Sequence, residues 1–253
     1  MKKKGDDVFK QFRDSFGSLS GHFHVLEQRV PLEVQMEYFK NSERLRDADM
    51  DSSLSDDEES VKAYEGLLSE ETTADEKKRI LSLLAISKSI KAYRLLEKYS
   101  KQPDPVISDW AYMALMESRI SLESELSDEK QIYISTGLGG RDEKLRFYVL
   151  ILSVGGKSLQ DYQRQVVERE FEYYLPQKGC EIERLTIEDK YVELLFLLPV
   201  KADIKGILDQ VITECNQYGN FLSPIYTITN VKELTPQEIE DLIRKNGDNK
   251  ASN

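Results

Sequence analysis

Two nearly continuous apolar runs in the second half of the chain limit its fold most strongly. KLRFYVLILS occupies residues 144–153, and YVELLFLLP occupies residues 191–199. Runs of this length and composition are typical of strands that are covered on both faces, so each run predicts a central strand of one sheet. Such a sheet needs helices on its faces, and the segments that follow both runs have helical patterns.

Helical and strand patterns alternate around these two runs. SLQDYQRQVVEREFEYYL at 158–175 and DIKGILDQVITECNQYG at 203–219 space their apolar residues like helices. CEIERLTIED at 180–189 and SPIYTITNV at 223–231 alternate like strands. The predicted order from 145 to 231 is β-α-β-β-α-β, the arrangement of a ferredoxin-like sheet with both helices on one face. The other face is then left for the preceding helical region to cover.

Further segments extend this predicted domain at both ends. QIYIST, at 131–136, predicts a strand that the glycine-rich hairpin GLGGRDE joins to the first apolar run. TPQEIEDLIRKN, at 235–246, predicts a terminal helix with Thr235 as its N-cap. We therefore expect an α+β domain over 131–246 and a disordered tail over 247–253.

The first half of the chain has helical periodicity, interrupted by one acidic stretch. DDVFKQFRDSF and PLEVQMEYFKNSERLR predict N-terminal helices within residues 1–46, and Leu32, Met36 and Phe39 form one apolar stripe of the second. An acidic linker over 47–60 follows, with very few apolar residues. A solvated linker is the simple interpretation of this stretch, and an acidic tether for a basic partner is the alternative.

Residues 61–130 predict a group of short amphipathic helices. ADEKKRILSLLAIS and SIKAYRLLEKYSK are separated by a tight turn, and PVISDWAYMALMESRISLESEL follows from Pro105. DPVISDWAYMALMES resembles the first helix of a HEAT-type repeat, in which small residues such as Ala111 and Ala114 let neighbouring helices approach closely. Trp110 lies in the same stripe and is expected in the core. The resemblance implies a HEAT-like helical region that needs further packing, because one and a half repeats rarely stand alone.

The acidity of the chain is concentrated in one segment. The net charge is −11, and residues 42–76 contain 13 acidic and three basic residues, a net of −10. This balance argues against non-specific nucleic-acid binding, which depends on neutralising phosphates. No apolar run approaches a membrane span or follows the initial lysines like a secretory signal. Cys180 and Cys215 have no CxxC spacing and are expected to be reduced core residues, so we expect a cytoplasmic protein without membrane partners.

Several motifs match known sites only in part. His22 and His24, in GHFHV, could share a metal ion on a strand, although carboxylates would have to supply the remaining ligands. GGKS, at 155–158, lacks the earlier glycine of a phosphate-binding loop, because that position is Ile151, and so Ser158 is expected as a helix N-cap. No catalytic constellation is complete. We expect no cofactor and no catalytic residue, and we favour a protein without enzymatic activity.

The segment EDKYVELLFLLPVKADIKGILDQVITECNQYG resembles the middle of the single-tyrosine HUH transposases. In that family the strand carries a histidine–hydrophobe–histidine triplet, whereas this chain has Tyr191, Val192 and Glu193. The resemblance implies a related ferredoxin-like fold without the metal-binding histidines. It leaves open an alternative function, in which a catalytically degenerate transposase-like fold binds single-stranded nucleic acid. Its expected phosphate contacts are Lys190, Lys201 and Lys205.

The leading interpretation is a non-enzymatic cytoplasmic protein-interaction or adaptor protein of α+β class. It would combine an N-terminal HEAT-like helical region with a C-terminal ferredoxin-like βαββαβ domain. Repeat-like helices commonly present protein-binding surfaces. The residues we expect to contact a protein partner are Lys91 and Arg94 on the predicted helix pair, and Arg141 and Lys144 at the glycine-rich hairpin.

Overall fold

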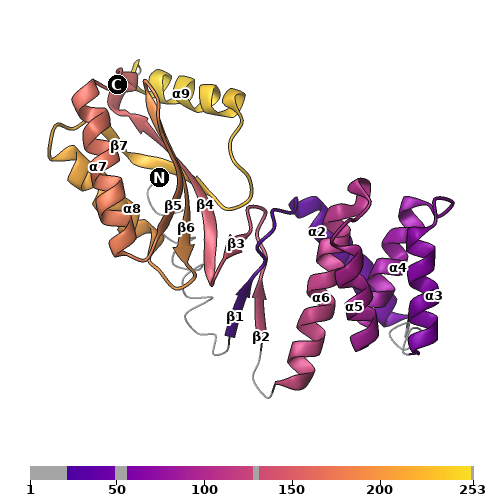
Figure 1. Cartoon of the computed structure of the whole chain (residues 1–253). Helices are drawn as coiled ribbons and strands as arrows, with labels where there is room; N and C mark the ends of the chain where they lie inside the picture. Colours follow the sequence, from indigo (N-terminus) through magenta and orange to yellow (C-terminus); the bar gives the residue numbers. More distant parts are fainter. Residues whose placement is uncertain (1–21, 49–55, 128–130, 252–253) are drawn as a thin grey trace. The chain divides into compact units, whose positions relative to one another are not determined.

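The computed structural model describes residues 22–48, 56–127 and 131–251. They form two compact units, a helical unit that ends at Ser135 and a sheet unit that continues from Thr136 (Figure 1). The helix predicted within DDVFKQFRDSF and residues 49–55 of the predicted acidic linker lie outside the described residues, and the end of that linker forms the first turn of a helix that begins at Asp57. None of the helices in these ranges is long and apolar enough to cross a membrane.

The helical unit contains five helices, one short 3-10 turn and two paired strands within the described ranges. They are β1 (His22–Val25), α2 (Leu32–Asp47), α3 (Asp57–Leu68), α4 (Ala74–Ile86), α5 (Ile90–Tyr99), η1 (Pro105–Ile107), α6 (Ser108–Leu126) and β2 (Gln131–Ile134). Helix α4 is central, because it packs against α2, α3, α5 and α6. The predicted hairpin between QIYIST and the first apolar run is wrong: β2 pairs in parallel with β1.

The core of the helical unit confirms one sequence prediction and corrects another. Trp110 is buried, and its indole Nε1 donates to the carbonyl of Lys78 at 3.0 Å. On α2, however, the buried side chains are Gln35, Tyr38 and Ser42 rather than the predicted apolar stripe. The polar side of α2 faces inward because Glu117 of α6 supplies a buried acceptor for Tyr38 and Ser42. The apolar stripe is therefore turned outward.

Over residues 136–251, the sheet unit is built from antiparallel strands and three α-helices. Its elements are β3 (Gly140–Arg141), β4 (Lys144–Ser153), η2 (Val154–Gly156), α7 (Asp161–Gln177), β5 (Glu181–Ile187), β6 (Tyr191–Pro199), α8 (Ile204–Asn216), β7 (Leu222–Thr229) and α9 (Pro236–Ala251). The strand order is β5–β6–β4–β7, and the short strand β3 also pairs with β4. Both apolar runs are thus central strands, as predicted, while α7 and α8 pack side by side on one face (Figure 1).

Helix α9 covers the opposite face of the sheet, which the sequence had left for the helical region. Ile239 of α9 belongs to one apolar cluster with Tyr148, Leu150 and Leu195 of the sheet. Thr235 caps this helix: its Oγ1 accepts from the Glu238 amide at 3.3 Å, and Glu238 accepts from the Thr235 amide at 2.8 Å. α9 continues to Ala251, through most of the predicted tail.

Both cysteines are free thiols in the core of the sheet unit. Burial raises the pKa of Cys180 to about 11 and that of Cys215 to about 12. The ordinary pKa of a cysteine is about 8.5. Both thiols therefore stay protonated at neutral pH and also at pH values where an exposed cysteine would ionise. Since the thiolate is the reactive form, this matches the predicted role as small core residues.

Candidate binding surfaces

Arg141 and Lys144 lie together at the start of the sheet, but they share one acidic partner. Nη2 of Arg141 lies 2.5 Å from Oε2 of Glu181, and Lys144 pairs with the other carboxylate oxygen. The hydrogen bonds from Lys144 and then from Arg141 lower the pKa of Glu181. Asp142 Oδ2 also lies 3.8 Å from Nε of Arg141, so two of the expected partner contacts form a cluster without net charge, in which Arg141 remains half exposed.

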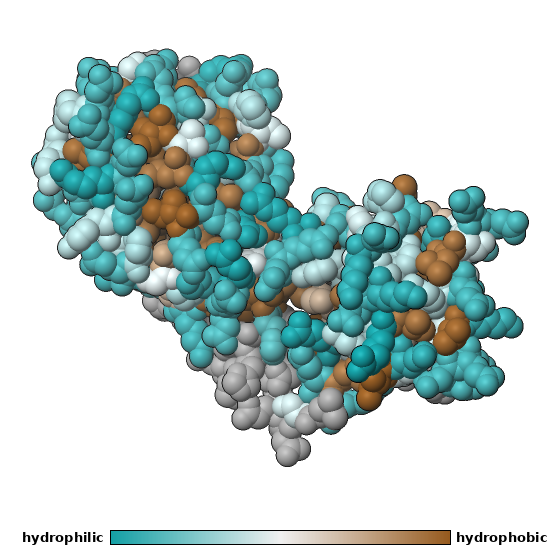
Figure 2. Space-filling view, viewed as in Figure 1, coloured by the Kyte–Doolittle hydropathy of each residue, from teal (hydrophilic) through white to brown (hydrophobic). Residues whose placement is uncertain are grey.

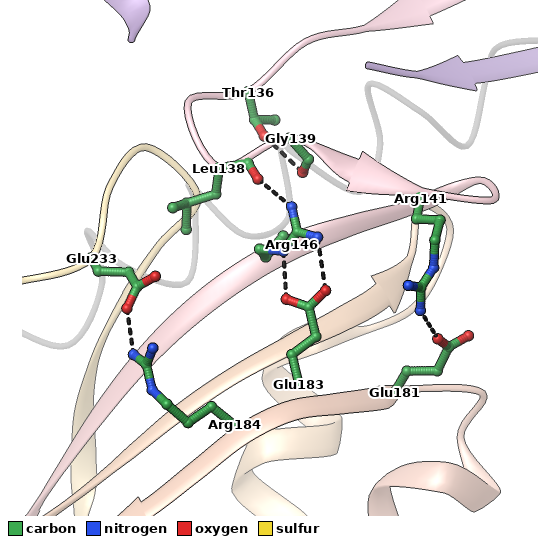
Figure 3. Close-up of polar contacts among 9 residues, drawn as sticks. All are labelled: Thr136, Leu138, Gly139, Arg141, Arg146, Glu181, Glu183, Arg184 and Glu233. Carbon is green, nitrogen blue, oxygen red and sulfur yellow. Dashed lines mark hydrogen bonds and ion pairs between the residues drawn. The ribbon is translucent and has the colours of Figure 1, made fainter. Parts of the chain in front are cut away.

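A second ion pair crosses the same face of the sheet beside this cluster. Arg146 on β4 forms a bidentate contact with Glu183 on β5, at 2.5 and 2.7 Å, over the strand β6 that lies between them (Figure 3). Arg146 also donates to the carbonyl of Leu138 at 2.6 Å. Its side chain is only 11% exposed. These contacts cover the sheet face next to the area that α9 covers, so this face offers no open platform.

Sequence reasoning did not identify the Arg146–Glu183 pair, although a signal for it exists. Lys144 and Arg146 alternate with apolar residues on one predicted strand, as Glu181 and Glu183 do on another. Side chains at every second position point to one face of a sheet. Opposite charges on that spacing therefore indicate cross-strand pairs, once the strand order is known.

Tyr191 and Glu193, which stand where the transposase resemblance places two histidines, point to the face covered by α9. Tyr191 packs beside the α9 cluster, and Glu193 Oε1 accepts a hydrogen bond of 2.6 Å from the Tyr148 hydroxyl. Burial, followed by the hydrogen bond to Glu193, raises the pKa of Tyr148. The arrangement stabilises a neutral tyrosine under a helix, which is a packing role.

The two histidines lie on β1. His24 is half-buried, and the side chain of His22 is outside the described part of the structure. Among the described residues, no group of three histidine, cysteine, aspartate or glutamate side chains is placed to hold a metal ion.

Lys190, Lys201 and Lys205 are not brought together. Lys190 precedes β6, whereas Lys201 and Lys205 follow it. The full length of the strand therefore separates Lys190 from the other two lysines. A strand rises about 3.3 Å per residue, which puts nine residues of β6 at about 30 Å. Lys205 pairs with Asp209 at 2.7 Å.

The GGKS loop forms the turn between β4 and α7. Gly155 and Gly156 both have positive φ, at 72° and 66°, which glycine adopts without strain. The prediction that Ser158 caps the helix is wrong, because Gln160 is the N-cap. The hydroxyl of Ser158 instead donates to Asp189 at 2.9 Å in the β5–β6 turn.

Lys91 and Arg94 lie on the exposed side of α5, beside a groove that α5 forms with α3. Lys91 lines this groove together with residues of α3, which are Asp57, Glu58, Val61, Lys62 and Glu65. The lining residues of α3 are therefore mainly acidic, and the one lining residue of α5 is the basic Lys91. Figure 2 shows hydrophobic residues exposed among hydrophilic ones on the helical unit. Within it, Val61 is 36% and Ile90 is 62% exposed.

Comparisons with known proteins give only a partial likeness. No family model matches the chain. No curated protein matches it. Among solved structures, a protein from Deinococcus radiodurans R1 assigned as a transposase aligns at a TM-score of 0.35 with 19% identity, covering 42% of this chain and 94% of its own. A REP-associated tyrosine transposase solved with a REP hairpin aligns at 0.32 with 9% identity, covering 40% of this chain and 64% of its own. Both similarities are low.

Proposed function

We propose that this protein is a non-enzymatic cytoplasmic interaction protein whose α3–α5 groove binds an amphipathic helix of a partner. The single observation that carries the proposal is the groove itself, in which Val61 of α3 is exposed among acidic residues of the same helix and faces Lys91 of α5. Helices with an apolar stripe commonly bind in grooves of this kind.

The packing of the helical unit supports this proposal. α3 contacts α4, α5 contacts α6, and the two pairs touch through α3–α5 and α4–α6. Stacked helical pairs of this kind support a HEAT-like arrangement, in which α3 and α5 form one outer layer. Both walls of the groove then belong to the same layer and are held by the same core.

The charges of the groove specify the chemistry of the partner. Asp57, Glu58 and Glu65 on α3 attract a basic side of the partner helix, and Lys91 with Arg94 on α5 attracts an acidic residue on its other side. Complementary charges at the rim orient a partner and select against wrong ones more than they add affinity. The contact energy comes from the apolar side chains, which we place against Val61 and Ile90.

The test is capture of partners by the tagged full-length protein from its native cytoplasm, with nuclease present. Glu65→Lys and Lys91→Glu each reverse one wall, and Glu172→Lys, an exposed position on α7, is the matched control. We expect a defined protein to be captured by the wild type and the control, and reduced at least about tenfold by either groove variant. A captured protein that both groove variants retain at the wild-type level contradicts the proposal.

For the sheet unit we propose a ferredoxin-like topology, and the order β5–β6–β4–β7 with crossovers through α7 and α8 supports it. Single-stranded nucleic acid is the second candidate ligand, because this topology is the one expected for the transposase-like alternative. The contacts would be Lys201, just before α8, and Lys205 in its first turn. Titration with a fluorescent single-stranded oligonucleotide at low salt tests it. Binding that weakens with salt and with Lys201→Glu supports this candidate, and unchanged anisotropy contradicts it.

A further inference from the structure

The apolar stripe of α2 is an exposed surface with a fixed orientation. Met36 is 72% and Phe39 is 50% exposed, and Leu32, which is half-buried, lies one turn before them in the same stripe. Their spacing, i, i+4 and i+7, is that of one apolar seam along a helix. α2 contacts α4 and α6, whereas the groove of the proposed function lies between α3 and α5. The two surfaces are therefore distinct.

Helix α2 cannot rotate to bury this stripe without breaking buried hydrogen bonds. Tyr38 and Ser42 on its inner side donate to Glu117 of α6 at 2.5 and 2.6 Å. Asn41 donates to Ser82 of α4 at 3.0 Å. Leaving such buried groups without partners is costly, so the apolar stripe faces outward as a permanent feature of the fold.

The charges beside the stripe indicate what covers it. Glu33 and Lys40 are both exposed and lie on the same flank of the stripe, at nearly equal distances in sequence before and after Met36. In the described part of the chain, no ion pair engages either of them. Two copies of α2 packed antiparallel around a two-fold axis near Met36 would pair Glu33 of each copy with Lys40 of the other. A parallel pair would instead place the flank charges of the two copies on opposite sides of the seam, where Glu33 and Lys40 could not pair.

We propose that α2 is a self-association surface, and that a second copy of this chain packs antiparallel on Leu32, Met36 and Phe39. The interface is isologous, since the same stripe serves both copies. The 16 residues of α2 form a helix about 24 Å long. A contact of that length is small beside the interfaces of stable dimers, so we expect a dissociation constant of about 10–100 μM.

Sedimentation equilibrium of the full-length protein from about 1 to 300 μM tests the proposal directly, a range that brackets the expected dissociation constant. We expect the mass to rise from that of the 29.2 kDa monomer towards twice that value. Met36→Asp with Phe39→Asp should remain monomeric throughout. Val106→Asp, which replaces an apolar side chain that is 81% exposed elsewhere in the helical unit, is the matched control and should dimerise like the wild type.

Charge reversal tests the antiparallel arrangement separately. Glu33→Lys and Lys40→Glu should each weaken the dimer at low salt, because each creates two like-charge contacts across the axis. The double variant should restore it, because the pairs are then exchanged rather than lost. A protein that stays monomeric at 300 μM, or a dimer that survives Met36→Asp with Phe39→Asp, contradicts the self-association surface. A double variant as weak as the single ones contradicts the antiparallel register.

Discussion

Replacement of Glu117 by leucine removes the buried acceptor that holds α2 against α6. The carboxylate is 8% exposed, and it accepts hydrogen bonds from Tyr38, Ser42 and Arg46. Tyr38 and Ser42 are themselves fully buried, at 0% and 1% exposure. Their hydroxyl groups therefore cannot reach water when Glu117 is removed, and leucine offers no acceptor in its place.

The expected loss follows from these two hydroxyl groups. A buried polar group left without a partner costs about 1–3 kcal/mol, so two of them cost about 2–6 kcal/mol. Arg46 adds less than about 1 kcal/mol, because its side chain is 51% exposed and regains water. We expect Glu117→Leu to lower the free energy of unfolding of the helical unit by about 2–6 kcal/mol.

The only tryptophan of the chain makes the measurement specific to this unit. Trp110 is buried there, with its ring centroid 5.2 Å from that of Tyr38 in an edge-on contact. Urea unfolding followed by tryptophan fluorescence therefore reports on the helical unit, because the sheet unit contains no tryptophan. With a slope of about 1–2 kcal/mol per molar urea, the unfolding midpoint should fall by at least about 1 M.

The same substitution in a Tyr38→Phe, Ser42→Ala background gives the decisive comparison. Neither of the two hydroxyl groups that bind Glu117 is then present to lose its acceptor, and exchanging a buried carboxylate for an apolar side chain is often close to neutral. We expect Glu117→Leu to lower the free energy of unfolding by at least about 2 kcal/mol more in the wild-type background than in the Tyr38→Phe, Ser42→Ala background. An equal cost in both backgrounds would refute the reasoning, because the loss would then have another origin.

Three further predictions concern the sheet unit. Both cysteines should resist iodoacetamide at pH 8 in the native protein and react in urea, as read by mass spectrometry, because burial keeps the thiols protonated; rapid native labelling would contradict this. A Cβ at residue 137 would lie 2.0 Å from the carbonyl oxygen of Val231, so Gly137→Ala should destabilise this unit by about 1–3 kcal/mol in hydrogen exchange of its strands. Hydrogen bonds from Lys232 and then Thr235 lower the pKa of Glu238 to about 2 from 4.5. The stabilisation by Glu238 is therefore present above pH 4.5 and lost as the pH falls towards 2, where the protection of the α9 amides relative to their intrinsic exchange rates should decrease; protection that stays constant down to pH 2 would contradict it.

Local sequence patterns determined most of the secondary structure. The run YVELLFLLP became β6 over the residues predicted, and ADEKKRILSLLAIS became α4 with its end one residue earlier. Thr235 could be recognised as an N-cap because the cap needs only a side chain and an amide three residues away. Periodicity and capping act over a few residues, and so they can be read from the chain itself.

The tertiary structure alone decided which faces are buried and which charges are paired. α2 buries its polar side because an acceptor 79 residues away in sequence, Glu117, lies opposite Tyr38. Arg141, offered by the sequence as a partner contact, is joined to Glu181, 40 residues further on. The strand β2 likewise joins the distant β1 rather than its neighbour β4. Each outcome depends on which residues meet across long sequence separations, and no local pattern carries that information.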